Sequence, residues 1–112
     1  MSNENLSGFV QELRRGTIVL CVLSKLRRPM YGYSLVSELT ECGIPVDGNT
    51  LYPLLRRLEA QGLLESNWNT DEAKPRKYYN TTAEGESVRE ALERNWRSMV
   101  ENMNRLFEED AK

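Results

Sequence analysis

The sequence contains no histidine and only two cysteines, Cys21 and Cys42. Without histidine, neither a Ser-His-Asp nor a Cys-His catalytic set can form. No CxxC or DxD spacing is present either, so we expect neither a metal site nor a cofactor. Two isolated cysteines do not make a disulfide framework, which favours a reducing, cytoplasmic setting. We therefore predict a protein that is not an enzyme, with both cysteines as small core residues.

Long hydrophobic runs are also missing. No stretch of about 18 or more apolar residues is present, so we expect no membrane span. The polar segment Met1–Gly8 lacks the apolar region of a signal peptide. Of the 112 residues, 39% are hydrophobic and 29% are charged. A chain of this length fits one domain that buries roughly two thirds of its unfolded surface, so pairing with a second subunit would add useful burial.

Excess positive charge is absent as well, which at first disfavours a nucleic-acid ligand. The net charge is −2 and the isoelectric point is about 5.3. However, residues 1–81 hold ten Lys and Arg against nine Asp and Glu, whereas residues 82–112 hold five against eight. The acidic excess therefore lies in the C-terminal segment, and DNA binding by the remainder is not excluded.

Apolar residues at spacings of three and four predict three helices in the first half of the chain. A largely buried helix is expected over about Ser7–Leu26, and a second from Tyr31 or Gly32 to about Cys42, with Gly43 after its end. A third helix is expected to run from near Asn49 to Gln61–Gly62. Its candidate N-cap residues are Asp47, Asn49 and Thr50. A start near Asn49 would place Pro53 in the fourth helical position, where its missing N–H costs little.

The pattern then changes to that of a β-hairpin. Leu63–Asn69 and Arg76–Thr81 are short segments rich in Leu, Trp and Tyr, and they flank the polar loop Thr70–Pro75. Because side chains alternate along a strand, one of Tyr78 and Tyr79 is expected to be buried.

A long helix is predicted from Thr82 to about Glu109. Thr82 can cap it, or Thr81 and Glu84 can form a capping box. Its apolar residues fit about two and a half heptads, which suggests helix pairing. The expected interface residues are Leu92, Trp96, Met99, Met103 and Leu106.

This order of elements predicts a mainly α fold with a small β-hairpin, namely a winged helix-turn-helix followed by a long helix. We expect residues 1–81 to form the DNA-binding domain and residues 82–112 the dimerisation helix, as one compact unit. The third helix can enter the major groove of double-stranded DNA, and the hairpin, or wing, can lie along the backbone.

Polar and basic side chains at the helix ends and the wing are the candidate DNA contacts. Asn and Arg can make paired hydrogen bonds to adenine and guanine, whereas Lys and Tyr suit phosphate. The candidates are Tyr31, Tyr33 and Ser34 in the second helix, Asn49, Thr50, Tyr52 and Arg56 in the third, and Lys74, Arg76 and Lys77 in the wing.

Some of these residues have a plainer interpretation. Arg56 can belong to a solvated helix face and pair with Glu59, Asn49 can serve only as a cap, and Tyr52 can serve only in packing. The acidic pair Asp71 and Glu72 in the loop would repel phosphate. These acids leave open an alternative function, a protein-interaction module that retains the fold without binding DNA.

Three segments together carry a family resemblance. YGYSLVSEL (31–39), TLYPLLRRLEAQGLL (50–64) and KPRKYYNTTAEG (74–85) resemble the PadR family of transcriptional regulators, including a T-x-x-G motif at Thr82–Gly85. The match is close from about Arg15 to Gly85, and a single last helix is similar to that of the short subfamily with multidrug-responsive members. The loop 70–73 lacks the Gly residues that relatives often carry there.

The resemblance implies a homodimer formed by the long last helix, which represses a gene by binding a pseudo-palindromic operator. It places DNA contacts at the start of the third helix and in the wing, which here are Asn49, Thr50, Tyr52, Arg56, Lys74, Arg76 and Lys77. In drug-responsive members a tryptophan of the last helix stacks planar aromatic ligands at the dimer centre. Trp96 occupies the matching position, although it can instead only pack the dimer.

Overall fold

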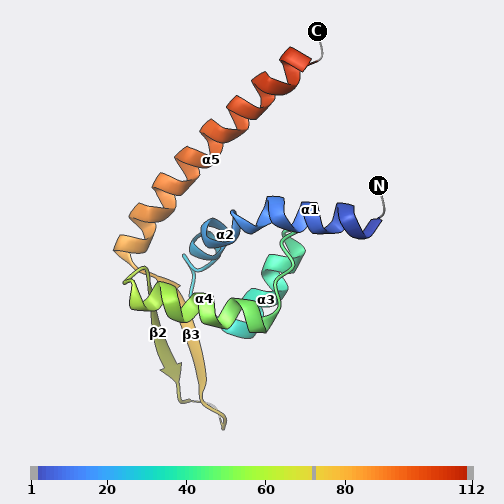
Figure 1. Ribbon diagram of the computed structural model, residues 1–112. Helices are drawn as coiled ribbons and strands as arrows, with labels where there is room; N and C mark the ends of the chain where they lie inside the picture. The colour runs from blue at the N-terminus through green and yellow to red at the C-terminus, as the bar shows by residue number, and fades with distance from the viewer. Residues whose placement is uncertain (1–2, 72, 111–112) are drawn as a thin grey trace.

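The computed structural model describes residues 3–71 and 73–110 and shows a winged helix-turn-helix with a projecting last helix. Figure 1 shows α5 and the β2–β3 wing extending in opposite directions from the helices between them. The elements, in chain order, are α1 (Asn3–Arg15), α2 (Ile18–Lys25), β1 (Met30–Tyr31), α3 (Gly32–Glu41), α4 (Gly48–Ala60), β2 (Leu64–Asn69), β3 (Arg76–Thr81) and α5 (Ala83–Asp110).

The single helix predicted over Ser7–Leu26 is wrong, because the chain forms two helices with a break at Gly16 and Thr17. The amide and the hydroxyl of Thr17 both donate to the carbonyl of Arg14, at 2.9 Å and 2.7 Å. Glycine has a low helix propensity and Thr17 satisfies a terminal carbonyl of α1, so the two residues together end that helix.

Helices α3 and α4 end as the sequence predicted. Gly43 and Gly62 follow the two helices with φ near +80°, a conformation that other residues rarely adopt. The next amides, those of Ile44 and Leu63, then bond back to the carbonyls of Leu39 and Leu58. Each helix thus ends in a glycine-dependent C-cap.

The start of α4 differs from the prediction. Asp47 is the N-cap, and its carboxylate accepts a 2.9 Å hydrogen bond from the Thr50 amide. The helix begins at Gly48, so Pro53 lies inside it and cannot donate to the carbonyl of Asn49. Asp47 was one of three candidate caps, and the other two, Asn49 and Thr50, do not cap the helix and are exposed.

The small sheet contains one strand that the sequence analysis missed. β2 and β3 form the expected hairpin, and β1 pairs with the outer edge of β3 to give the order β1-β3-β2, all antiparallel. β1 has only two residues, Met30 opposite Tyr79 and Tyr31 opposite Tyr78. A strand of that length has no periodicity to detect.

The core lies between α2, α3, α4 and the base of the sheet. Tyr79 is its aromatic member, which confirms that one tyrosine of the pair is buried. The other core residues are Val22, Leu23, Leu26, Leu35, Leu39, Val46, Leu51, Leu55, Leu58 and Leu64.

The first turns of α5 are fixed to this core by a cap and an ion-pair network. Thr82 caps α5, as predicted, by accepting from the Gly85 amide at 3.0 Å. Arg89 is only 8% exposed, and its guanidinium binds the carboxylates of Glu86 and Glu93 at 2.9 Å. Glu86 also contacts Arg27, just after α2, at 3.2 Å.

Candidate nucleic-acid interface

The start of α4 presents polar side chains that its own helix does not use. Asn49, Thr50 and Arg56 are all exposed. The carboxylate of Glu59 lies against Lys77 and Ser66, and no ion pair involves Arg56 within the described ranges. The expected Arg56–Glu59 pair is therefore not observed. Asn49 at the start of α4 and Arg56 farther along its exposed face have the chemistry that reads base edges.

Tyr52 has a packing role in addition to its exposed edge. A Cβ atom built on Gly32 would lie 2.6 Å from the Tyr52 ring, and one on Gly48 would lie 3.1 Å from it. The ring therefore covers the first residues of both α3 and α4, and only 37% of Tyr52 is exposed. This contact fixes the two helix starts relative to each other.

The start of α3 faces the wing. Tyr31 is half-buried, and its hydroxyl accepts a 3.0 Å hydrogen bond from Asn69 Nδ2. Tyr33 is exposed, and its hydroxyl accepts from the guanidinium of Arg76. Ser34, the next residue along, is half-exposed. Both tyrosine hydroxyls thus contact the protein itself.

The three basic residues of the wing lie in different environments. Lys74 and Arg76 are exposed. Lys77 is half-buried, with its ammonium 3.8 Å from the Glu59 carboxylate and 5.3 Å from the centre of the Tyr79 ring. Lys77 therefore links β3 to α4. The nearby Glu59 carboxylate partly offsets the positive charge that Lys77 presents to a phosphate. Of the acidic pair in the loop, Asp71 is exposed and Glu72 lies outside the described residues.

A groove separates the starts of α3 and α4 from the wing. It has a volume of about 550 Å³, and its walls combine aromatic rings with cations. Its principal lining residues are Tyr33, Tyr52, Arg56, Trp68, Arg76 and Lys77. Cations placed among aromatic faces suit a polyanion that also offers sugar and base surfaces.

Trp68 was not identified as a site residue from the sequence. It is 63% exposed, although tryptophan is a costly residue to expose. In the hairpin it lies directly opposite Lys77, so both belong to the side of the wing that faces α4. Strand alternation places Trp68 on one side of β2, but the register of the hairpin is needed to show that this is the side of Lys77.

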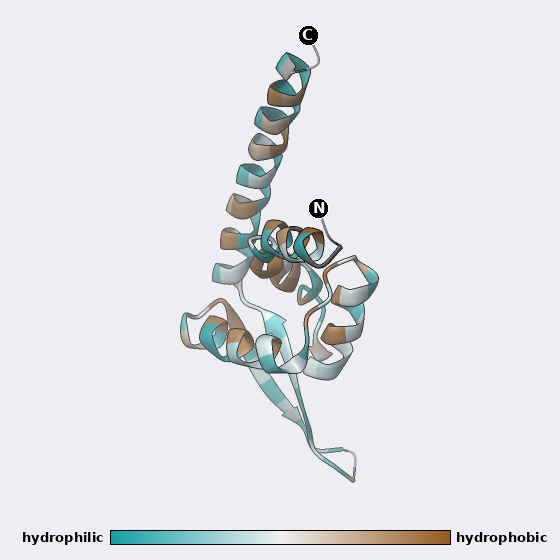
Figure 2. Cartoon of the chain, turned by 45° about the vertical axis from the view of Figure 1, so that its right-hand side comes forward, coloured by the Kyte–Doolittle hydropathy of each residue, from teal (hydrophilic) through white to brown (hydrophobic). Residues whose placement is uncertain are grey.

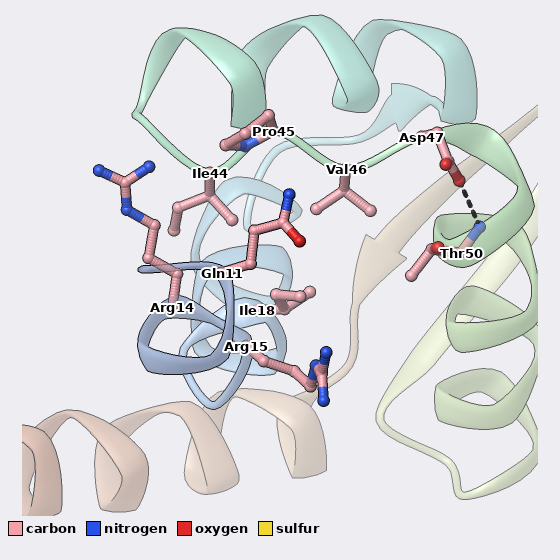
Figure 3. Close-up of a pocket in the computed structure, with 9 residues that line it drawn as sticks. All are labelled: Gln11, Arg14, Arg15, Ile18, Ile44, Pro45, Val46, Asp47 and Thr50. Atoms are coloured by element: carbon pink, nitrogen blue, oxygen red, sulfur yellow. Dashed lines mark hydrogen bonds between the residues drawn. The ribbon is translucent and has the colours of Figure 1, made fainter. Parts of the chain in front are cut away.

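A second cavity, of about 250 Å³, lies behind the start of α4 and is shown in Figure 3. Ile18, Ile44, Pro45 and Val46 form its apolar part, while Gln11, Arg14 and Arg15 extend from the end of α1 beside it. The Asp47–Thr50 cap lies at one side of this cavity.

The apolar residues of α1 and α5 form an uncovered surface. Leu6, Phe9 and Leu13 are 53–79% exposed, so the expectation that this stretch is buried is wrong for a single chain. Figure 2 shows hydrophobic residues recurring along the projecting part of α5. The exposed large apolar side chains of this part of α5 are 44–63% exposed, and they are Trp96, Met99, Met103, Leu106 and Phe107. So many exposed apolar residues on adjacent helices are typical of an association surface.

Three of the predicted interface residues, Leu92, Trp96 and Met99, also lie against their own chain. Leu92 is half-buried and packs against the core. Trp96 lines an apolar cleft of about 170 Å³ between α5 and the α1–α2 junction, together with Leu13, Leu20 and Met99. The uncovered surface therefore includes a small cleft that ends at Trp96.

The two cysteines lie in different environments. Cys21 is half-buried, and burial raises the pKa of its thiol. Cys42 is exposed, so its prediction as a core residue is wrong. Within the described residues, no three potential metal ligands of the His, Cys, Asp and Glu types come together. The helices described here also lack the length and apolar character of a membrane span.

Known proteins match most of this chain in sequence. The sequence model of the PadR-like family of transcriptional regulators matches residues 19–91, which span α2 to the first turns of α5. The chain belongs to this family. The PadR-like chain is also 35% identical over 89 residues to the transcriptional regulator Rv3488 of Mycobacterium tuberculosis, a match that covers 75% of this chain and 83% of the relative.

Solved structures agree with the PadR-like fold. A PadR family regulator from Eggerthella lenta superposes with a TM-score of 0.88 and is 51% identical, with 94% of each chain covered. A PadR-like regulator from Bacillus cereus gives a TM-score of 0.79 at 27% identity and covers 86% of this chain and 96% of its own. The PadR-like chain is thus a transcriptional regulator with a winged-helix DNA-binding fold.

Proposed function

We propose that this PadR-like regulator is a cytoplasmic, homodimeric repressor that binds a pseudo-palindromic operator in double-stranded DNA. The observation that carries this proposal is the groove between α4 and the wing, where Arg56, Arg76 and Lys77 stand among aromatic rings. Arginine on the exposed face of α4 and arginine on the adjacent wing can contact a base edge and the flanking phosphates together. The near-neutral charge of residues 1–81 predicts modest non-specific affinity, so specific contacts supply much of the binding.

The proposed DNA contacts follow from exposure and from the contacts within the chain. Asn49, Thr50 and Arg56 are exposed at α4 and read base edges. Ser34 and Lys74 contact the DNA backbone, and so does Arg76 from its place beside Tyr33. Tyr31, Tyr52 and Lys77 were also candidate DNA contacts from the sequence. Because their side chains have partners within the chain, we assign them to holding the DNA-binding surface in shape rather than to the main DNA contacts.

We propose that dimerisation uses α1 together with α5. The exposed residues of both helices supply the apolar area that a stable interface requires. Trp96, Met99, Met103 and Leu106 carry the α5 part, and Leu92 contributes from its half-buried position. A two-fold axis through this surface brings the two Trp96 side chains near each other.

The cleft at Trp96 supports binding of a small planar aromatic effector that relieves repression. Its lining is mainly apolar, and a tryptophan face suits ring stacking. A Trp68→Phe variant leaves Trp96 as the single tryptophan. We expect the planar dye proflavine, added without DNA, to quench the fluorescence of that variant, whereas unchanged fluorescence would argue that Trp96 only packs the dimer.

The repressor proposal is tested by electrophoretic mobility shift with the DNA upstream of the protein's own gene. We expect a complex at low micromolar dimer that weakens steeply as salt increases, because bound cations release counterions from the phosphates. Absence of any salt-sensitive complex would refute the proposal. Capture of a specific protein partner by the same DNA-inactive dimer would support the interaction module instead.

A further inference from the structure

The outer end of the wing is held by side chains rather than by the sheet. The backbone ladder between β1 and β3 stops at the pair Tyr31–Tyr78. Farther out, the last pair of the β2–β3 ladder is Asn69 opposite Arg76, and the loop begins immediately after it. An isolated hairpin has little stability of its own in water, so whatever contacts this pair controls the position of the wing.

Both residues of that closing pair reach the start of α3. Asn69 Nδ2 donates to the Tyr31 hydroxyl at 3.0 Å, and the Arg76 guanidinium donates to the Tyr33 hydroxyl. One tyrosine therefore holds each strand of the wing. The tyrosines are two residues apart in the chain, on either side of Gly32, where β1 passes into α3.

The aromatic rings reinforce these hydrogen bonds. The rings of Tyr31 and Tyr33 are stacked, with centroids 5.8 Å apart and planes within 10° of parallel. The guanidinium carbon of Arg76 lies 5.5 Å from the first centroid and 5.3 Å from the second, within cation–π range of both. Tyr78 packs its ring against Tyr31 at 75°. The cluster combines a charged hydrogen bond, a neutral one and ring contacts in one place.

We propose that Tyr31 and Tyr33 are positioning residues that hold the wing at a fixed distance from α4. This inference rests on the proposed DNA-binding function. Tyr52 already fixes the starts of α3 and α4 relative to each other. With the wing fastened to the same point of α3, the α4 start and the wing reach DNA as one preorganised surface. Preorganisation improves affinity because less ordering entropy is lost on binding.

The test uses variants that remove only the hydroxyl groups. Tyr31→Phe/Tyr33→Phe retains both rings and loses both hydrogen-bond acceptors. Tyr78→Phe is the matched control, since it removes a hydroxyl from the same cluster, and within the described residues that hydroxyl makes no hydrogen bond. A neutral and a charge-assisted hydrogen bond are at stake in each subunit, so we expect the double variant to bind operator DNA about tenfold more weakly or worse. The control should bind like the wild type.

A second comparison isolates the coupling to the wing. If Tyr33 acts through Arg76, then Tyr33→Phe should weaken binding in the wild-type background and have little effect in an Arg76→Ala background. Equal losses in both backgrounds would overturn the proposal, because the hydroxyl would then act on DNA directly. Unchanged binding by the double Phe variant would overturn it too.

A measurement without DNA separates this inference from the proposed function. Hydrogen exchange of the amides at the outer end of the β2–β3 ladder, in residues 67–69 and 76–78, should be several-fold faster in Tyr31→Phe/Tyr33→Phe than in the wild type, while the amides of α4 remain protected. Equal exchange in the two proteins would refute the positioning role even if DNA binding were intact. Failure of the wild type to bind any DNA, with faster exchange in the variant, would refute only the repressor function and leave the wing attachment standing.

Discussion

Thr82 and Gly85 form a two-sided contact at the start of α5. The Thr82 hydroxyl accepts from the Gly85 amide at 3.0 Å and donates to the Gly62 carbonyl at 2.7 Å. Gly85 lies so close to the preceding chain that a Cβ atom would be 2.1 Å from the Leu63 carbonyl oxygen and 2.7 Å from Thr81. The T-x-x-G motif therefore consists of a cap and a glycine that allows α5 to approach the end of α4.

Gly85→Ala should destabilise the fold strongly. The new methyl group meets backbone, which cannot move away as a side chain can, so we expect a loss of about 2 kcal/mol or more in the free energy of unfolding. Urea denaturation measures this change. Gly8→Ala is the control, because a Cβ atom there has nothing within 4 Å. A Gly85→Ala protein as stable as that control would contradict the close contact.

Asp47→Ala and Asn49→Ala should affect different properties, the first stability and the second DNA binding. Asp47 caps α4, so its loss should lower the free energy of unfolding by about 1 kcal/mol. Asn49 is exposed and makes no side-chain cap, so its loss should leave stability nearly unchanged and weaken operator binding. Thermal unfolding and DNA titration of both variants check this. Equal destabilisation by the two would mean that Asn49 also supports the helix.

Much of this architecture could be predicted from the sequence. The pattern predicted α3, both strands of the wing, α5 and its cap, because each has strong periodicity or a clear terminal residue. The break at Gly16–Thr17 was missed because the apolar spacing continues through it. The exposure of Leu13 was missed for another reason: apolar periodicity shows which face of a helix is hydrophobic but not which partner covers it.

The candidate site was less predictable than the fold. Composition identified the basic and amide side chains, yet it could not show that Lys77 pairs with Glu59 or that Tyr31 bonds to Asn69. These contacts join elements far apart in the chain and depend on the hairpin register. Asn49 and Arg56 were easier to identify, because both lie off the apolar stripe of α4 and exposure follows from that stripe alone.

Arg56→Ala and Lys74→Ala should change DNA binding in different ways. Arg56 lies on α4, so its loss should cost about 1–3 kcal/mol on the preferred operator and relax the sequence preference at one position. Lys74 is an exposed wing residue, so its loss should weaken all DNA alike and reduce the salt slope by about 1 per subunit. Titrations at several salt concentrations with matched and mismatched operators measure both effects. Identical behaviour of the two variants would contradict the division between base and phosphate contacts.

The attachment of α5 should weaken in acid. Hydrogen bonds from Arg89 hold the pKa values of Glu86 and Glu93 below their ordinary range. A carboxylate whose pKa is lower in the folded state stabilises the fold above the ordinary value of about 4.3, and this stabilisation is lost as pH falls through the lowered pKa.

Arg89→Met should remove most of the cause of the lowered pKa values of Glu86 and Glu93. Thermal unfolding followed from neutral pH to below pH 4 should then show a smaller acid-induced loss of stability in the variant than in the wild type. If the unfolding temperatures of the two proteins fell equally as the pH was lowered, the ion-pair network of Arg89 would not be the source of the acid sensitivity.

The most direct test of the central claim is the stoichiometry and symmetry of the DNA complex. An operator selected from random duplex DNA should carry inverted half-sites whose centres lie one helical turn, about 10 base pairs, or a multiple of it apart. Analytical ultracentrifugation with that duplex should give two chains per operator. A single chain per duplex, or a selected sequence without inverted symmetry, would contradict a homodimer that reads DNA with α4 and the wing.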